Sequence, residues 1–115
     1  MSDDCIFCKI ASGEMESELV YEDDSVVAFS DINPVAPHHI LIIPRKHIAS
    51  INEIGEGEAK LIGRLFLAAG KLAKDLGVDQ PGYRCVINTN KDAGQAVFHI
   101  HLHLLAGRKL GWPPG

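Results

Sequence analysis

Three histidines alternate with apolar residues toward the carboxyl end of the chain, as His99, His101 and His103. Successive side chains of a β-strand point to opposite faces of a sheet, so this alternation predicts that the three imidazoles share one face. The intervening Ile100 and Leu102 would face the core. An imidazole titrates near neutral pH and can serve as a nucleophile, a general acid or base, or a metal ligand.

The three imidazoles have three possible roles: solvent-facing groups of an edge strand, ligands of one metal ion, or acid-base and nucleophilic groups. Along a straight strand the Cα atoms of His99 and His103 would lie roughly 13 Å apart, so three rings converge poorly on one ion, although a pair could ligate. We therefore favour chemistry without a metal, with the central His101 as the nucleophile.

Two of the three cysteines, Cys5 and Cys8, are separated by two residues, and Cys85 is remote from both. The N-terminus shows no basic and apolar leader, which favours a cytoplasmic protein with reduced thiols or metal ligands. By itself the cysteine pair is a weak metal signal, because two nearby cysteines can simply be reduced thiols.

The composition predicts one globular domain over residues 1–115, with 46% hydrophobic and 23% charged residues. Lys and Arg number 11 against 15 Asp and Glu, giving a net charge of -4, so we expect no nucleic-acid partner. The longest stretch free of polar side chains, residues 65–70, is far shorter than the ~20 residues of a membrane-spanning helix, so no membrane partner is expected either.

The pattern of apolar and turn residues predicts an α+β protein. We expect strands over residues 26–29, 40–43, 83–89 and about 98–105, with an edge strand over 18–21. A long helix is predicted over residues 58–76, with an apolar stripe of Ile62, Leu65, Phe66, Ala69, Leu72, Ala73 and Leu76. The expected architecture is an antiparallel sheet of about five strands with this long helix packed on it and a short N-terminal helix.

The histidine motif belongs to a wider pattern that resembles the histidine-triad nucleotide-binding superfamily. The matching segments are residues 5–10 (Cys-Ile-Phe-Cys-Lys-Ile), 36–48, 94–95 and the final Trp-Pro-Pro-Gly, which looks like the Hint branch of nucleoside phosphoramidases. The resemblance covers nearly the whole chain. It implies hydrolysis of purine nucleoside 5′-phosphoramidates, of the AMP or GMP type, to the nucleoside monophosphate and an amine through a covalent nucleotidyl-histidine.

The resemblance also implies roles for individual residues. His101 would attack the α-phosphorus, His103 would bind phosphate oxygens, and His39 would tune the charge of the cluster, which includes His99. The nucleotide would be bound by Asp31 at the ribose hydroxyls, by Phe29 and Ile32 at the base and sugar, by Asn88 and Gln95 at the phosphorus centre, and by Ala96 and Val97.

Ala96 departs from the family pattern, which often has Ser or Thr after Gly94-Gln95. The missing hydroxyl predicts lower turnover than in a Ser-bearing relative. It keeps open an alternative, a purine-nucleotide-binding or protein-interaction module with little turnover. A zinc-dependent hydrolase that uses the three histidines as ligands is a further alternative.

Two further expectations rest on the resemblance. Cys5, Cys8, His47 and His99 would bind a structural zinc ion, because two Cys and two His complete a tetrahedral shell. Catalysis itself would require no metal. The protein would form a two-fold homodimer with a sheet continuous across the interface, and the tail of one subunit would approach the active site of the other.

Overall fold

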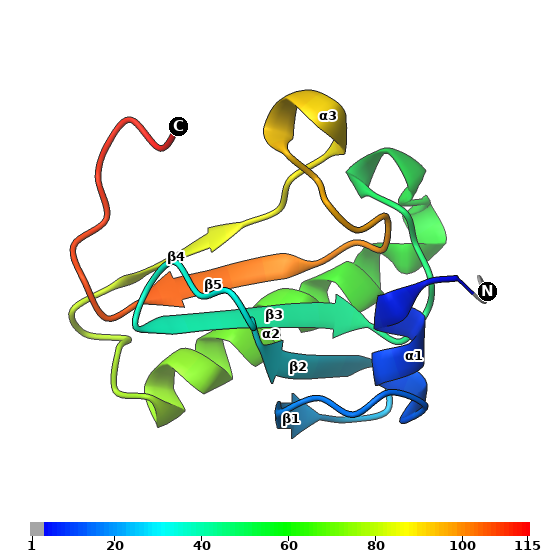
Figure 1. The fold of residues 1–115 in the computed structure, drawn as a ribbon, viewed down its shortest axis with the longest axis horizontal. Coiled ribbons are helices and arrows are strands. Elements are labelled where there is room, and N and C mark those ends of the chain that lie inside the picture. Colours follow the sequence, from blue (N-terminus) through cyan, green and yellow to red (C-terminus); the bar gives the residue numbers. More distant parts are fainter. Residues whose placement is uncertain (1–3) are drawn as a thin grey trace.

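The computed structural model describes residues 4–115 and confirms the predicted α+β architecture (Figure 1). Five strands and one long helix dominate it. The elements are α1 (Ile6–Ser12), β1 (Leu19–Glu22), β2 (Val26–Ser30), β3 (His38–Pro44), the 3₁₀ turns Ile51–Glu53 and Glu56–Glu58, α2 (Ala59–Asp75), β4 (Tyr83–Val86), α3 (Asn90–Ala93) and β5 (Leu102–Ala106).

The five strands form one antiparallel sheet in the order β1-β2-β3-β5-β4. Strands β3 and β5 are therefore neighbours at the centre, although some 60 residues separate them in the chain. Their register places His39 opposite Leu105 and Leu41 opposite His103. This pairing brings the histidines of two distant segments to one part of the sheet.

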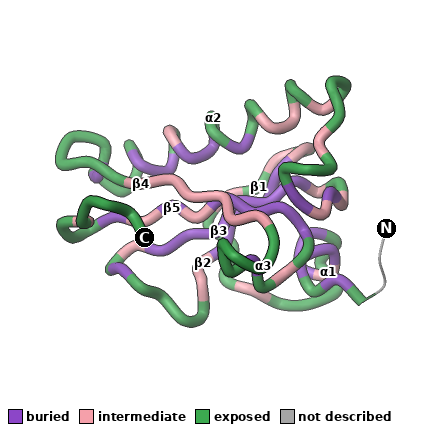
Figure 2. Tube along the Cα trace, turned by 90° about the horizontal axis from the view of Figure 1, so that it is seen from above, coloured by how far each residue is buried: buried purple, intermediate pink, exposed green. Residues whose placement is uncertain are grey.

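Each face of the sheet is covered differently (Figure 2). Helix α2 packs on one face against Ile40, Ile42 and Leu102, which are at most 4% exposed. Helix α1 packs on the other face against Leu41 and Ile43. Because side chains alternate along a strand, β3 contributes to both cores, which is why its residues 40–44 are all apolar.

Helix α2 follows the predicted stripe except at Phe66 and at Leu76, which follows the last residue of the helix and is 37% exposed. Its buried residues recur at spacings of three and four, as Leu65, Ala68, Ala69, Leu72 and Ala73. Phe66, which the sequence analysis placed in the stripe, is 50% exposed because it lies one residue, about 100° of helical rotation, away from Leu65. None of the helices in residues 4–115 is both long and apolar enough to span a membrane.

The predicted strand over residues 98–105 is wrong at its start. Strand β5 begins at Leu102, and residues 97–99 form a bend. There the Ile100 N–H donates to the Ile48 carbonyl at 2.6 Å, so the backbone pairs with the loop after β3 instead of with a strand. Similarly, β4 ends at Val86 rather than at residue 89, where the chain turns into α3.

Candidate active site and metal centre

All three triad imidazoles lie on the face of the sheet that carries α1. The Phe7 ring, from α1, contacts the rings of His99 and His101 edge-on, with centroids 6.0 and 5.0 Å apart. The His101 and His103 rings are 4.9 Å apart. His99 and His101 are buried, so they are not the solvent-facing side chains of an edge strand.

The protonation of the His101 ring is set by the backbone. Its Nδ1 lies 2.8 Å from the His99 carbonyl oxygen, which can only accept, so Nδ1 carries the proton. In the neutral ring the lone pair is then on Nε2. Burial lowers the pKa of His101, which keeps that ring neutral and its lone pair available near pH 7. A neutral imidazole with an available nitrogen is a nucleophile.

His39 and His103 form a directed hydrogen-bond chain beside His101. The Val35 N–H donates to His39 Nδ1 at 3.1 Å, so a neutral His39 carries its proton on Nε2. That nitrogen lies 2.9 Å from His103 Nδ1 and 3.4 Å from an oxygen of Asp31. His103 Nδ1 therefore accepts, and its Nε2–H remains as a donor. Burial, followed by repulsion from His101 and His39, lowers the pKa of His103 to about 4.

A pocket of about 460 Å³ lies at these rings. Its lining includes the two imidazoles of His101 and His103 and the carboxylate of Asp31. The rest of its lining is mostly apolar and comes from α1 and the loop after it, from β2 and β3, and from the loops around residues 32 and 96: Ile6, Phe7, Ile10, Met15, Glu16, Ser17, Phe29, Ser30, Ile32, Asn33, Leu41, Ala96 and Val97. An apolar pocket with a few convergent polar groups is the usual form of a small-molecule site.

Two of the predicted nucleotide contacts, Asn88 and Gln95, are not part of this lining. Gln95 braces the surrounding loops instead. Its side-chain oxygen accepts from the Asn90 N–H at 2.8 Å, and its amide nitrogen donates to the carbonyls of Ala49 and Val97 at 2.7 and 3.1 Å. The side chain that could have been a phosphate donor is thus engaged within the protein.

Helix α1 contributes Ile6, Phe7 and Ile10 to the pocket, a role that was not predicted from the sequence. Their apolar i, i+1, i+4 spacing was visible in the sequence, but short apolar segments are common in cores. Val35 was also missed, because it acts through its backbone N–H, which every residue except proline has.

Cys5, Cys8, His47 and His99 come together beside this pocket in a cysteine–histidine cluster. One potential ligand atom from each lies within 4.8 Å of the others. Cys5 Sγ is 3.3 Å from His99 Nδ1, and Cys8 Sγ is 3.3 Å from His47 Nδ1. A tetrahedral zinc ion keeps its ligand atoms roughly 3.3–3.8 Å apart. The cluster therefore has the spacing and the soft donors that could bind a metal.

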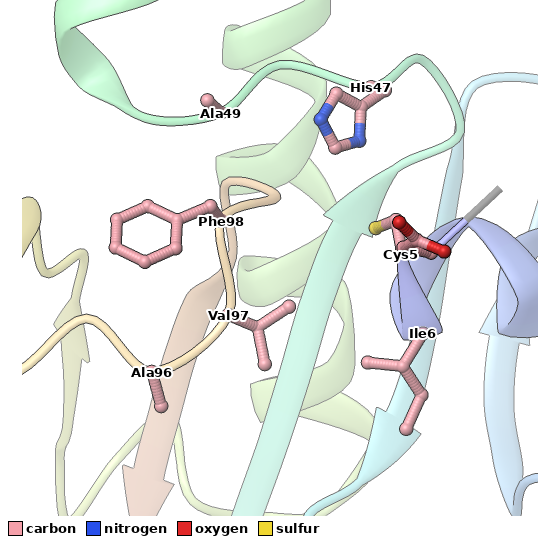
Figure 3. A pocket seen from close by; sticks show the side chains of 8 residues that line it. Cys5, Ile6, His47, Ala49, Ala96, Val97 and Phe98 are labelled. Atoms are coloured by element: carbon pink, nitrogen blue, oxygen red, sulfur yellow. The ribbon is translucent and has the colours of Figure 1, made fainter. Parts of the chain in front are cut away.

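The hydrogen bonds of the cluster also suit a metal. His99 Nε2 donates to the Pro44 carbonyl at 2.8 Å, which leaves the Nδ1 lone pair facing the two sulfurs. The Cys8 N–H at the start of α1 donates to Cys5 Sγ at 3.3 Å, which holds this sulfur at the start of the helix. Figure 3 shows Cys5 and His47 at a second pocket, which shares Ile6, Ala96 and Val97 with the first.

A second set of potential ligands, Asp31, His39 and His103, also lies within 4.8 Å. Its hydrogen bonds are of the opposite kind. A ligating histidine normally donates from its outer nitrogen, but the outer nitrogen of His39 accepts from Val35. Its inner nitrogen consequently holds the proton. The hydrogen bonds of Asp31, His39 and His103 therefore suit a hydrogen-bonded chain rather than a metal site.

The comparisons with known proteins agree with this geometry. Residues 12–110 match the model of the HIT domain, and the chain belongs to that family. It is similar to the purine nucleoside phosphoramidase of Escherichia coli (strain K12), with 47% identity over 96% of this chain and 93% of the relative.

Solved structures give the same result. A HIT family hydrolase from Legionella pneumophila Philadelphia 1 superposes with a TM-score of 0.96 and 51% identity, over 97% of this chain and 100% of that one. A histidine triad protein from Clostridium difficile superposes with a TM-score of 0.94 and 50% identity, over 96% of both chains.

Proposed function

We propose that this protein hydrolyses the P–N bond of purine nucleoside 5′-phosphoramidates through a nucleotidyl-histidine at His101. The observation that carries the proposal is the pairing of a lone-pair nitrogen with an N–H donor in one pocket, on His101 and His103. The 47% identity to a purine nucleoside phosphoramidase supports the substrate class.

In the first step, His101 Nε2 attacks the α-phosphorus and the bond to the amine nitrogen breaks. The amine leaves with the bonding electron pair and takes a proton from solvent water. The new P–N bond leaves positive charge on the ring, which the Nδ1–H shares with the His99 carbonyl. Because His103 Nε2–H can donate to a phosphoryl oxygen, it stabilises the charge that builds up there in the transition state.

In the second step, water attacks the phosphorus, the bond to His101 breaks, and the attacking water releases a proton to solvent, which balances the proton that the amine took up in the first step. The products are the nucleoside monophosphate and the neutral ring with its original tautomer. The same hydrogen bonds serve both steps, because each step passes through a phosphorus centre with the same charge.

Asp31 and the apolar lining select the nucleoside in this proposal. One Asp31 oxygen accepts from the Asn33 N–H at 2.8 Å, which orients the carboxylate at the edge of the pocket toward ribose hydroxyls. Phe29 and Val97 offer apolar surface to a base, and Ile32, 89% exposed, lies at the rim.

The decisive experiment is to trap the intermediate. The protein is mixed with an adenosine 5′-phosphoramidate, quenched in base and analysed by mass spectrometry. We expect one added nucleotidyl group on the peptide that contains His101. His38→Ala is the matched control, since His38 belongs to neither the pocket lining nor the cysteine–histidine cluster and, unlike His39, is not hydrogen-bonded to His103, and it should still label. Turnover without any label in the wild type would refute the covalent step.

The second candidate is a purine-nucleotide-binding module with little turnover, and Ala96 is the observation that favours it. Ala96 lines the pocket but has no hydroxyl to offer the phosphate or the leaving amine. Micromolar binding of AMP together with no measurable hydrolysis of several phosphoramidates would establish this alternative.

We also propose that the cysteine–histidine cluster binds one structural zinc ion. Its four ligands close the shell and leave no position for substrate or water, so the ion would hold α1 and the bend at residue 99 together. Elemental analysis of protein purified without chelator should find one zinc per chain. A metal-free, fully folded and thermally stable preparation would overturn this.

Finally, we propose a two-fold homodimer. Strand β4 is an edge of the sheet, and Tyr83, an aromatic residue on this strand, is 39% exposed. Pairing would cover both the open edge and this aromatic side chain. Sedimentation at micromolar concentration should give twice the chain mass, and a monomer would contradict the proposal.

A further inference from the structure

The segment that follows β5 returns to the loop between β2 and β3. Arg108 donates from Nε and Nη2 to the Val35 carbonyl at 3.3 and 3.0 Å, and from Nη1 to the Lys109 carbonyl at 3.0 Å. Gly107 fits closely against Pro37, where a Cβ would lie only 2.7 Å from the proline Cβ. The C-terminal segment and the loop are thus held together next to the pocket.

Val35 connects this contact to the histidines through its backbone. Its carbonyl accepts from Arg108, while its N–H donates to His39 Nδ1 at 3.1 Å. The Val35 side chain is 59% exposed, so packing does little to fix this residue. The guanidinium, with two donors on one carbonyl, is the contact that holds it.

We propose that Arg108 is a positioning residue that sets the tautomer of His39 and, through it, the donor of His103. With Val35 in place, His39 Nδ1 accepts and Nε2–H donates to His103 Nδ1 at 2.9 Å. His103 then presents Nε2–H to the pocket. The consequence for catalysis rests on the proposed function, because an N–H there is useful only to an anionic substrate.

Loss of Arg108 would weaken this selection. If Val35 moves, His39 can carry its proton on Nδ1, and His103 must then donate from Nδ1 to His39. The nitrogen of His103 that faces the pocket would become a lone pair and repel a phosphoryl oxygen. Asp31, 3.4 Å from His39 Nε2, still favours the original tautomer, so the loss is partial. One hydrogen bond of this kind corresponds to about a tenfold change in kcat.

The direct test measures the tautomers by long-range ¹H–¹⁵N NMR of histidine-labelled protein. In the wild type, His39 should be protonated on Nε2 only. Arg108→Ala should show Nδ1 protonation on His39 and a kcat about tenfold lower. Arg108→Lys, which keeps a charged donor, should restore most of both. Lys109→Ala is the matched control, since its contact to Arg108 is through the backbone, and it should behave as the wild type.

Adenosine binding separates positioning from collapse of the pocket. Adenosine carries no phosphate, so its affinity should stay within about twofold in Arg108→Ala. Protonation of His39 on Nδ1 in the wild type, or an unchanged tautomer and kcat in Arg108→Ala, would overturn the proposal. If Arg108→Ala changes the His39 tautomer but the wild type hydrolyses no phosphoramidate, the proposed function is refuted and the positioning role of Arg108 stands.

Discussion

Two neighbouring groups of histidines on one face of the sheet differ in which ring nitrogen carries the proton. In the cysteine–histidine cluster, the outer nitrogen of His99 donates to the Pro44 carbonyl, which frees the inner nitrogen for a metal. Beside it, the outer nitrogen of His39 accepts from the Val35 N–H, which places a proton on the inner nitrogen. A backbone partner, rather than residue type or proximity, therefore decides what each imidazole can do.

The two groups are joined at His99. Its fully buried ring belongs to the cluster, whereas its carbonyl accepts from His101 and sets the tautomer of the proposed nucleophile. Phe7, which lies between the two cysteines in the sequence, packs edge-on against both rings. Structural support and chemistry are therefore separate tasks carried out by adjoining atoms.

The largest expected effect comes from removing the nucleophile. His101→Ala should lower phosphoramidate turnover by at least ~10³-fold, because the covalent route is lost. AMP binding, measured by calorimetry, should persist. Turnover above one tenth of the wild type would show that the pocket histidines are not organised around His101.

Removing the metal from the other group should instead lower stability. With zinc at a thousand times its dissociation constant, Cys8→Ser should lower the free energy of unfolding by about 4 kcal/mol. Denaturant unfolding with metal analysis measures this, and Cys85→Ser, a thiol on β4 outside the cluster, is the control. Two zinc ions per chain would contradict the difference between the two histidine groups, since Asp31, His39 and His103 should bind none.

Acid should act on the pocket group through His103. Its folded pKa, about 4, lies below the unfolded value near 6.5, so the unfolded chain binds more protons between these values. Stability should therefore fall as the pH drops from 6.5 toward 4. The charges near this ring act in both directions, since His101 and His39 lower the pKa of His103 and Asp31 raises it. Thermal unfolding of the wild type and His103→Asn should show a shallower pH dependence in the variant; equal slopes would exclude His103 as the cause.

The smallest effect is a gain. Ala96→Ser should raise turnover a few-fold, because the new hydroxyl can donate one hydrogen bond at the exposed wall of the pocket. Steady-state kinetics with Ala96→Gly as the size control would measure it. No gain would show that leaving-group handling does not depend on a hydroxyl here.

Much of the fold could be predicted from local patterns. The alternation of residues 99–103 indicated a shared face, the i, i+3, i+4 stripe indicated α2, and the apolar run at 40–43 indicated a central strand. These signals are local because they follow from the geometry of a strand and of a helix. They were inaccurate where tertiary contacts replaced them, as at residues 98–101, where the Ile100 N–H donates to the Ile48 carbonyl instead of to a strand.

The sequence by itself determined which side chains are available: imidazoles in phase, two nearby thiols, a carboxylate at the end of β2 and an apolar segment around Phe7. Only the tertiary structure decided what they do. The pairing of β3 with β5 brought His39 to His103, and the backbone groups of Pro44, His99 and Val35 assigned a proton to one nitrogen of each ring. Because nearly every residue has the same backbone N–H and carbonyl, no sequence pattern shows which of them will face a given imidazole.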